Sequence, residues 1–381
     1  MHVHVIVAPS AYHKDPLKYR RHQLVRFLLE NQETKIIWVC SDEGLFETIR
    51  KRLKSESLAD GIVEIDVFDF KNIVKNIEYL QTTLLKTIEK YYINNKQKKY
   101  YLWYTYPAFS SLIKLGIWDK VIYDCSDLWN EMVYEKKTSC LQRIKKQIFA
   151  RTEKKIVERS DQCFASSSFL FQRLARKHSN VMLIENGVDY YHFQNVNVSR
   201  LAQHDRVPTI GFIGGLKPWK VDFRLLAELA VSKRDWNIAV IGPLYGEQTE
   251  EIRYLIAQSN VKYTPYVPYE KVPEVIQTFD VGLLPYLENE YNQAVFPLKL
   301  FEYLAVGVPV VGCGLPSTLN YASENIYVHV PSRVQDVIAA CESLMVKRNE
   351  HIEERRALAR QADWKQKFEL MWHAVNHCRM E

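Results

Sequence analysis

The 381-residue sequence lacks several short motifs that define common sites. No Asp-x-Asp, Cys-x-x-Cys, His-Glu-x-x-His or Gly-x-Ser-x-Gly segment occurs anywhere in the chain. These absences count against a metal site built on paired aspartates, a zinc ribbon, a zinc protease and a hydrolase with a nucleophile elbow. The sequence therefore predicts no bound metal.

The chain also lacks a regular set of cysteines, long apolar runs and a strong charge. Its seven cysteines are odd in number and scattered, which is typical of reduced thiols in a cytosol. The start of the chain has no secretory pattern, and no apolar run approaches the roughly 20 residues of a spanning helix. A net charge of +6 is too small to indicate nucleic acid. We expect a cytoplasmic protein whose membrane contact, if any, is peripheral.

What the sequence does contain is a regular alternation of short apolar runs and longer amphipathic stretches. The length predicts two or three domains of roughly 150 residues. Stretches such as 20–30 and 46–54 have helical spacing, and the alternation indicates βαβ units with a largely parallel sheet. The expected strands are Val3–Ala8, Lys35–Cys40, Ile62–Phe68, Tyr100–Tyr104, Val121–Cys125, Gln162–Ala165, Val181–Ile184, Thr209–Ile213, Asn237–Ile241, Val261–Thr264, Val281–Leu284, Val308–Val311 and Ile326–Val330.

A polar, poorly periodic segment at Gln194–Val207 predicts a linker between two doubly wound α/β domains. We place the domains at residues 1–200 and 201–381. The final helix, about residues 363–381, is predicted to pack back on the first domain. Open α/β sheets bind ligands at the carboxyl ends of their strands, so a cleft between the domains is the expected site.

The most informative stretch is Phe296–Val311, with the sequence F-P-L-K-L-F-E-Y-L-A-V-G-V-P-V-V. Pro297 is suited to the start of a helix, and the free N–H groups of the first turn, from Leu298 on, can hold a diphosphate. Lys299 adds positive charge at the same end. Glu302 lies on the same face and can accept the hydroxyls of a ribose. An amphipathic helix with a solvated lysine and glutamate is the alternative interpretation.

A second candidate element lies upstream, where the strand at 209–213 ends in Gly214 and Gly215. Glycines there allow the backbone to approach a phosphate closely. Lys217 and Lys220 follow on the same loop and supply positive charge. A tight turn between a strand and a helix also needs glycines, so a purely structural role for Gly214 and Gly215 remains open. The pattern is not a Walker A sequence.

The order of these segments resembles the donor domain of GT-B glycosyltransferases, in particular the group 1, family 4-like enzymes of bacterial cell-surface polysaccharides, the teichuronic-acid type among them. The matching segments are Gly211–Trp219, Ile241–Pro243, Tyr266–Pro273, Phe279–Tyr286 and Pro297–Val311. The resemblance implies two Rossmann-like domains in a GT-B fold, with Tyr266 and Val267 beside the base of the donor.

The resemblance also implies an activity. The enzyme is expected to move a sugar from a nucleotide-diphosphate sugar, with UDP as the expected nucleotide, to a glycan or a lipid-linked acceptor, without a metal or other cofactor and with retention. Lys299 would act in catalysis by stabilising the leaving diphosphate. One departure is Ala294, because many relatives have a glutamate at this position, eight residues before Glu302. Its absence leaves the sugar and the anomeric outcome open.

The first half resembles the same family more weakly, at Arg159–Ser168 and Ile184–Phe193. Asp124 and Asp127 follow a predicted strand and are the candidates for binding an acceptor hydroxyl or accepting its proton. An Asx-type turn is the alternative for both. Tyr106, His13 and Arg20 also follow strands and are predicted to meet the acceptor, although such side chains are often only solvated.

Residues 136–159 form a basic stretch with nine Lys and Arg against two Glu. Leu141, Ile144, Ile148 and Thr152 recur at helical spacing, so this stretch predicts a basic amphipathic helix. Such a helix can rest on anionic lipid at the inner face of the membrane. A core-packed helix with a solvated basic face is the alternative.

Two other functions fit the same sequence. One is a nucleotide-sugar epimerase or hydrolase of the same fold, which needs no acceptor. The other is a non-catalytic subunit of a polysaccharide-assembly complex, which Ala294 keeps open. Nothing in the sequence indicates a nucleic-acid partner.

Overall fold

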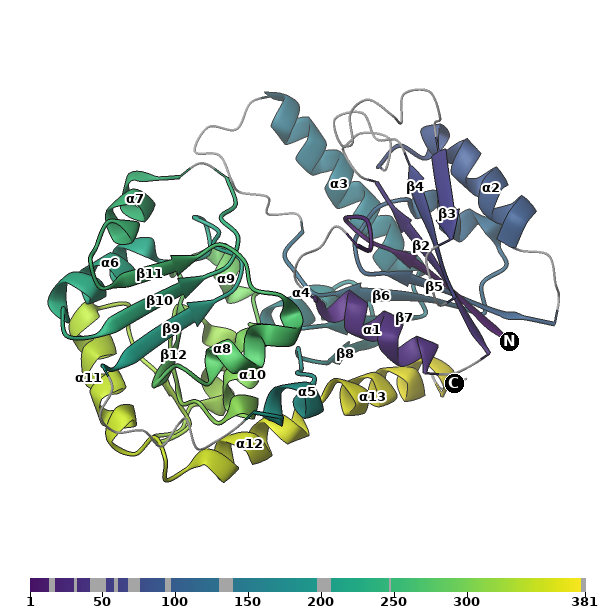
Figure 1. Cartoon of the computed structure of the whole chain (residues 1–381). Helices are drawn as coiled ribbons and strands as arrows, with labels where there is room; N and C mark the ends of the chain where they lie inside the picture. Colours follow the sequence, from purple (N-terminus) through teal and green to yellow (C-terminus); the bar gives the residue numbers. More distant parts are fainter. Residues whose placement is uncertain are drawn as a thin grey trace. The chain divides into compact units, whose positions relative to one another are not determined.

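The computed structural model describes residues 1–13, 18–30, 33–41, 53–57, 61–67, 76–92, 97–129, 140–196, 207–246 and 248–377. Its contacts divide the chain into two units (Figure 1). The first contains Met1–Glu185 and Phe368–Glu381, and the second contains Asn186–Lys367. The chain therefore crosses between the units twice.

The first crossing lies before the polar segment that the sequence suggested as a linker. The division falls at 185/186, whereas the sequence prediction placed it at 200/201. Asn186 Nδ2 donates to the carbonyl of Phe296 at 2.7 Å, and Val188 forms a bridge with Asp363. These contacts fix residues 186–188 within the second unit. Residues 197–206 lie outside the described part of the chain.

An eight-stranded sheet forms the centre of the first unit, in the order β3-β4-β2-β1-β5-β6-β7-β8. All neighbours are parallel except β3 and β4. The strands are β1 (His2–Val7), β2 (Thr34–Cys40), β3 (Leu53–Ser57), β4 (Ile62–Val67), β5 (Lys99–Tyr104), β6 (Lys120–Cys125), β7 (Gln162–Ala165) and β8 (Val181–Leu183).

Strand β3 corrects the helix predicted at 46–54, because residues 53 and 54 are extended. Residues 46–52 lie outside the described chain. The strand is short and polar, and it pairs Lys54 with Asp66 at the edge of the sheet. An edge strand needs no apolar face on both sides, so the apolar pattern that identifies the other strands is missing here.

Helices cover both faces of this sheet, which follows from alternate side chains on β6. Asp124 contacts Arg20 at the start of α1 (Arg20–Leu29), whereas the neighbouring Tyr123 donates to Glu153 of α3 (Cys140–Arg159). Successive side chains of a strand point to opposite faces, so α1 and α3 lie on opposite sides. The remaining elements are η3 (Glu78–Gln81), α2 (Thr82–Tyr92), η4 (Ser110–Leu115) and α4 (Ser168–Ala175).

The last helix, α13 (Trp364–Asn376), joins the first unit from Phe368 onward. The ring of Phe368 lies 5.6 Å from that of Phe27 on α1. Trp372 lies 5.6 Å from the ring of His4 on β1. This segment therefore packs on the same face of the sheet as α1.

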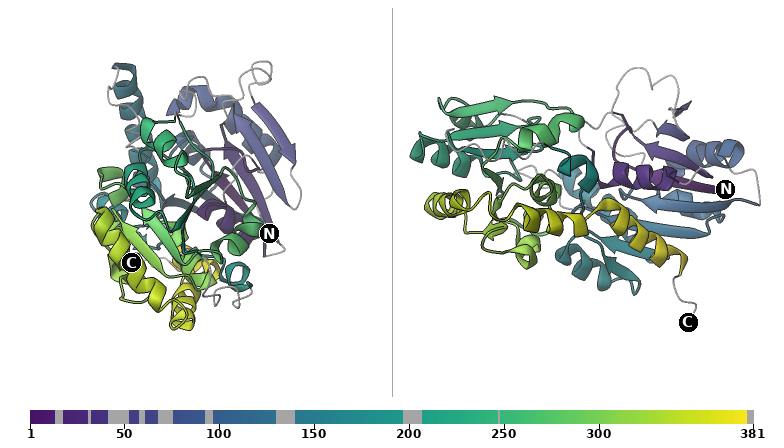
Figure 2. Two further views of the ribbon diagram at one scale, coloured as in Figure 1. Left: turned by 60° about the vertical axis from the view of Figure 1, so that its left-hand side comes forward. Right: turned by 60° about the horizontal axis from the view of Figure 1, so that its bottom comes forward.

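The second unit holds a six-stranded parallel sheet in the order β11-β10-β9-β12-β13-β14, with helices on both sides (Figure 2). The strands are β9 (Thr209–Ile213), β10 (Asn237–Ile241), β11 (Val261–Thr264), β12 (Val281–Pro285), β13 (Val310–Cys313) and β14 (Tyr327–His329). This is the doubly wound nucleotide-binding order, in which the direction of strand addition reverses between the first and fourth strands.

Two apolar cores lie on the two faces of this sheet. One contains α10 with α8 and α12, and the other contains α6, α7 and α11. The helices of the unit are α5 (Tyr190–Gln194), α6 (Phe223–Ser232), α7 (Glu250–Ile256), α8 (Val272–Ile276), α9 (Glu290–Gln293), α10 (Leu298–Val306), α11 (Val334–Val346) and α12 (Ile352–Gln361), with η6 (Tyr269–Lys271) and η7 (Pro316–Tyr321).

Candidate active site

The point where the strand order reverses in the second unit lies between β9 and β12. These strands pair only at Ile210–Val281 and Gly211–Gly282, so they part toward their carboxyl ends. The N–H of Ile213 donates instead to the hydroxyl of Tyr303 on α10, at 3.0 Å. Ligands of doubly wound sheets bind at such a reversal point. The same helix that carries the predicted Lys and Glu therefore reaches this position.

The amino end of α10 is open to an anion. The helix runs from Leu298 to Val306, and Pro297 at its N-cap provides no side-chain hydrogen bond. The N–H groups of its first turn have no partner within the helix. Pro297 is buried, but Leu298 and Lys299 are partly exposed. The tip of the helix thus reaches the surface, as a diphosphate site requires.

Two glycines bring the ends of β9 and β10 close to this tip. A Cβ built on Gly214 would lie 3.9 Å from Cε of Lys299. Gly242 has a φ of +132°, and a Cβ there would lie 1.9 Å from the carbonyl oxygen of Gly214. Only glycine at 242 permits this approach of the two backbones. The predicted glycine turn and the predicted helix start are therefore neighbours in space.

Lys299 and Glu302 form an ion pair with each other, from Nζ to Oε2. Their side chains are 15% and 6% exposed, so the pair is largely shielded from water. The sequence assigned the lysine to a diphosphate and the glutamate to a ribose, without predicting this contact. A residue spacing of three on a helix places the two groups on one face, which is the local reason for the pair.

The loop after Gly214 and Gly215 is held in place by α9. Nδ2 of Asn292 donates to the carbonyl of Lys220 at 2.9 Å. The ammonium of Lys220 lies 4.6 Å above the ring of Tyr291, and that of Lys217 lies 4.9 Å above the ring of Tyr245. These cation–π contacts hold both predicted lysines on the loop that follows the glycine turn.

Tyr266 and Val267 follow β11, the edge strand beside β10. Tyr266 is 52% exposed, and Val267 is partly buried against the core that includes α10. Both therefore lie at the carboxyl edge of the sheet, and their role beside a base stays a prediction. Ala294 is fully buried at the end of α9. That position offers no carboxylate to a sugar.

In the first unit, the structure pairs Asp124 with Arg20, a contact that the sequence did not predict. Both side chains are almost fully buried, and Arg20 Nε donates to the two oxygens of Asp124 at 3.1 and 2.8 Å. Arg20 also donates to the carbonyl of Ile184 at 2.7 Å. The acceptor roles of these two residues therefore stay predictions. The pair holds the chain at Ile184, just before the first crossing.

The other acceptor-side candidates divide by burial. Asp127 is partly exposed, and its Oδ1 accepts the N–H of the next residue, Leu128, at 2.9 Å. Tyr106 is buried, and its ring lies 4.9 Å from that of Trp129. His13 is exposed. Asp127 and His13 are the candidates that remain open to solvent.

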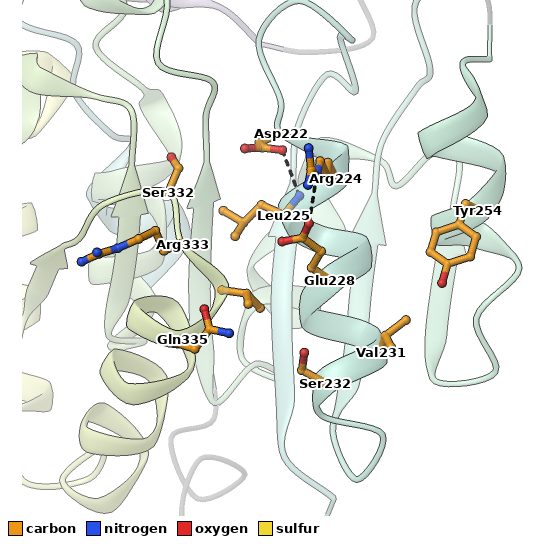
Figure 3. Close-up of a pocket in the computed structure, with 11 residues that line it drawn as sticks. Asp222, Arg224, Leu225, Glu228, Val231, Ser232, Tyr254, Ser332, Arg333 and Gln335 are labelled. Atoms are coloured by element: carbon orange, nitrogen blue, oxygen red, sulfur yellow. Dashed lines mark hydrogen bonds and ion pairs between the residues drawn. The ribbon is translucent and has the colours of Figure 1, made fainter.

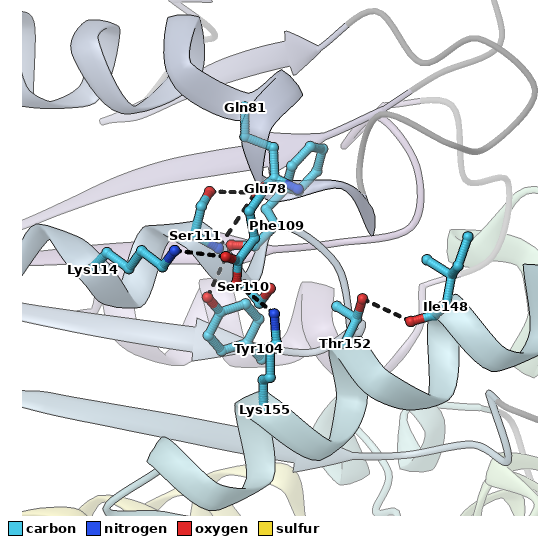
Figure 4. Close-up of polar contacts among 10 residues, drawn as sticks. All are labelled: Glu78, Gln81, Tyr104, Phe109, Ser110, Ser111, Lys114, Ile148, Thr152 and Lys155. Atoms are coloured by element: carbon cyan, nitrogen blue, oxygen red, sulfur yellow. Dashed lines mark hydrogen bonds and ion pairs between the residues drawn. The ribbon is translucent and has the colours of Figure 1, made fainter.

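A polar cluster that the sequence did not reveal links α3 to η3 and η4 (Figure 4). Glu78 of η3 accepts hydrogen bonds from Lys114 at 2.6 Å, Ser110 at 3.1 Å and Lys155 at 3.2 Å. The bond from Lys114 is the main cause that lowers the pKa of Glu78. No local pattern links these four residues, because they come from three separate elements.

The second unit also has a hollow of about 620 Å³ away from the glycine turn (Figure 3). Its lining comes from α6, α7 and the start of α11, on the face of the sheet opposite α10. Within it, Arg224 pairs with Glu228 at 2.9 Å, and Asp222 accepts the N–H of Leu225. Because this face of the sheet is opposite α10, the hollow is separate from the candidate site.

No group of three or more His, Cys, Asp or Glu side chains in the described chain is placed to hold a metal ion. Among the helices that the structure describes, none is both long and apolar enough to cross a membrane.

Comparisons with known proteins fit this geometry. Residues 207–347 match the family model described as glycosyl transferases group 1. The chain is 35% identical over 379 residues to a teichuronic acid biosynthesis glycosyltransferase of Bacillus subtilis strain 168, covering 95% of this chain and 94% of that protein. It is 28% identical over 115 residues to the 2-deoxystreptamine glucosyltransferase of Streptomyces kanamyceticus, covering 28% of each chain.

Solved structures show the same architecture over the whole chain. HepE from Anabaena, in complex with UDP and glucose, has a TM-score of 0.70 at 13% identity, covering 98% of this chain and 99% of that chain. Sucrose-phosphate synthase from Thermosynechococcus elongatus has a TM-score of 0.69 at 12% identity, covering 100% of both. The two sheets therefore make the GT-B fold. With the sequence match above, the chain belongs to the group 1 glycosyltransferases.

Proposed function

We propose that this glycosyltransferase moves a sugar from a UDP-sugar to a hydroxyl of a glycan or lipid-linked acceptor in bacterial cell-wall or capsular polysaccharide synthesis. The observation that carries the donor assignment is the meeting of Gly214, the open tip of α10 and the Lys299–Glu302 pair. The UDP in the HepE complex and the similarity to the teichuronic acid enzyme support the nucleotide and the pathway class.

In the proposed reaction, a bond forms between the acceptor oxygen and the anomeric carbon while the bond from that carbon to the diphosphate breaks. The N–H groups at the tip of α10 and the ammonium of Lys299 stabilise the negative charge on the leaving diphosphate. Glu302 accepts a hydroxyl of the ribose. Donor binding would thus separate the ion pair and give each partner its own ligand. The site would need no metal or other cofactor.

The acceptor side of the reaction rests on fewer observations. The proton that leaves the acceptor hydroxyl goes to a carboxylate or to the departing phosphate, and Asp127 is the partly exposed carboxylate after β6. We propose retention at the anomeric carbon, as the resemblance implies. Ala294 removes the carboxylate that many relatives place at this position, so no side chain here would serve as a nucleophile.

A thermal-shift series followed by product analysis tests the donor assignment. We expect UDP and one or more UDP-sugars to raise the melting temperature by several degrees at concentrations well above Kd. With donor and acceptor together, a glycosylated product should form. Release of free sugar or an epimer in equal amount to UDP without any acceptor would favour the hydrolase or epimerase instead. Binding without turnover would favour a non-catalytic subunit.

We further propose that α3 contacts anionic lipid through exposed basic side chains between Arg143 and Arg151. Arg143, Lys146 and Arg151 are exposed, and Ile144 is 48% exposed among them. The sequence had placed Ile144 on the apolar inner face, whereas the inner face begins nearer Phe149. A surface isoleucine flanked by basic groups suits the boundary between lipid headgroups and acyl chains. Residues 136–139 of the predicted basic stretch lie outside the described chain.

Vesicle sedimentation tests this contact. The double variant R143E/K146E should bind vesicles of phosphatidylcholine and phosphatidylglycerol more weakly than the unaltered protein, with a loss in affinity of about tenfold or more. The reason is that each basic group near the membrane surface adds roughly 1 kcal/mol to the binding free energy. The control R234E/K262E makes the same charge change on exposed positions of the second unit and should bind as before. Equal loss in both variants would show a net-charge effect and reject a role for α3.

A further inference from the structure

The backbone that leads into α10 is held by side chains from distant parts of the second unit. Nδ2 of Asn186 donates to the carbonyl of Phe296 at 2.7 Å, and the hydroxyl of Ser317 donates to the carbonyl of Val295. The ring of Phe296 is buried and lies 5.7 Å from that of Phe301 on the helix itself. Val295 and Phe296, the two residues before Pro297, are therefore held by hydrogen bonds to their carbonyls, and Phe296 is also held by the packing of its ring.

The Asn186 contact acts on the peptide bond that starts the helix. The carbonyl of Phe296 and the nitrogen of Pro297 belong to one planar peptide unit, so holding the oxygen sets the plane from which α10 departs. Pro297 gives the helix no side-chain cap, and it has no N–H through which another group could hold it. The direction of the open N–H groups at the tip thus depends on contacts made just upstream.

Core packing alone explains Asn186 poorly. Asn186 is only 8% exposed, and its Oδ1 is buried with no hydrogen-bond partner among the described residues. A buried polar atom without a partner costs stability. The orientation of the amide is nevertheless settled, because a carbonyl acceptor requires the nitrogen to face it.

Asn186 is also the first residue of the second unit. The carbonyls of the two preceding residues, Ile184 and Glu185, accept hydrogen bonds from Arg20 in the first unit at 2.7 and 3.3 Å. The chain therefore passes directly from the Arg20–Asp124 anchor to the residue that holds the start of α10. The first residue after the crossing thus donates to the carbonyl that precedes this helix.

We propose that Asn186 is a positioning residue for the donor site, which acts through Phe296 to aim the tip of α10 and Lys299 at the diphosphate. This inference rests on the proposed function, because it assumes that the tip binds the donor. Asn186 itself need not touch the donor. Its effect should therefore appear in donor affinity and not in acceptor affinity.

The variant Asn186→Asp tests the proposal with almost no change in shape. It replaces the N–H donor by a carboxylate oxygen that faces the Phe296 carbonyl. We expect the Kd for UDP, measured by calorimetry on folded protein, to rise about tenfold. The KM for the donor should rise with it, and the KM for the acceptor should stay unchanged. Asn186→Ala is the second variant, for use if Asn186→Asp does not fold. It removes the hydrogen-bond donor without adding charge and should also weaken UDP binding.

Asn260→Asp is the matched control. Nδ2 of Asn260 donates to the carbonyls of Ala230, Lys233 and Trp236, each at 3.0 Å, where α6 leads toward β10. This substitution should lower the melting temperature of the second unit without changing the Kd for UDP. If both Asn186 variants bind UDP as the unaltered protein does, the positioning role is overturned while the donor site stands. If the unaltered protein binds no UDP or UDP-sugar, the proposed function fails and this inference fails with it.

Discussion

Glu302→Gln is expected to lower kcat/KM for the donor by about 10- to 100-fold, because it removes a charged hydrogen-bond acceptor for a ribose hydroxyl. Glutamine keeps the length and much of the shape of the side chain. It also leaves Lys299 without its carboxylate partner in a largely buried position. Donor affinity by calorimetry and initial rates with a fixed acceptor give the two measurements.

The second unit offers a closely matched control for this variant. Lys271 and Glu274 form another pair at a spacing of three, with Nζ and Oε1 2.9 Å apart. Their side chains are 62% and 57% exposed, away from the tip of α10. Glu274→Gln should leave donor affinity unchanged, since exposed pairs contribute little. Unaltered donor affinity in Glu302→Gln would remove the main support for the donor site.

Arg355→Met is expected to destabilise the second unit by on the order of 3–5 kcal/mol, the largest stability effect we foresee. Arg355 is fully buried, and burial lowers its pKa to about 10. Its guanidinium donates to the carbonyls of Gly307 at 3.0 Å and Asn325 at 2.9 Å, and also to that of Arg348. Methionine fills much of the volume but leaves these buried carbonyls without donors.

Urea unfolding followed by circular dichroism measures this effect, with Arg224→Met as the control. Arg224 is 82% exposed and pairs with Glu228 one turn along α6, so its loss should change stability by less than about 0.5 kcal/mol. Because Gly307 ends α10, loosening this end should also weaken UDP binding in partly destabilised samples. Equal midpoints for Arg355→Met and the unaltered protein would show that the buried guanidinium contributes little.

The elements that carry the candidate donor site were largely predictable from the sequence, and their role in binding a donor stays a prediction. The first two turns of α10 and its N-cap contain Pro297, Lys299 and Glu302. Gly214 directly follows a strand whose apolar pattern is clear. Such features depend on neighbours along the chain, so spacing alone locates them. The sequence did not show that Lys299 and Glu302 pair with each other rather than waiting for separate ligands.

The acceptor side was less predictable, because the same local pattern has two outcomes. Asp124 lies near the end of β6 and Asp127 lies just after it, so the two looked alike in the sequence. In the structure, Asp124 is buried in an ion pair with Arg20, 104 residues away, whereas Asp127 is partly exposed. Which of two nearby carboxylates meets an arginine depends on the face of the sheet against which α1 packs.

The sequence by itself determined the two α/β domains, nearly all of the strands and the residues at the tip of α10. These follow from apolar periodicity, helix starts and glycine turns, which are set by residues close together in the chain. Only the tertiary structure decided the partners of Asn186, Glu78 and Arg355. Asn186 and Phe296 are 110 residues apart, and packing between distant segments brings their polar groups together. Burial and pairing of a side chain are properties of that packing, so no local pattern records them.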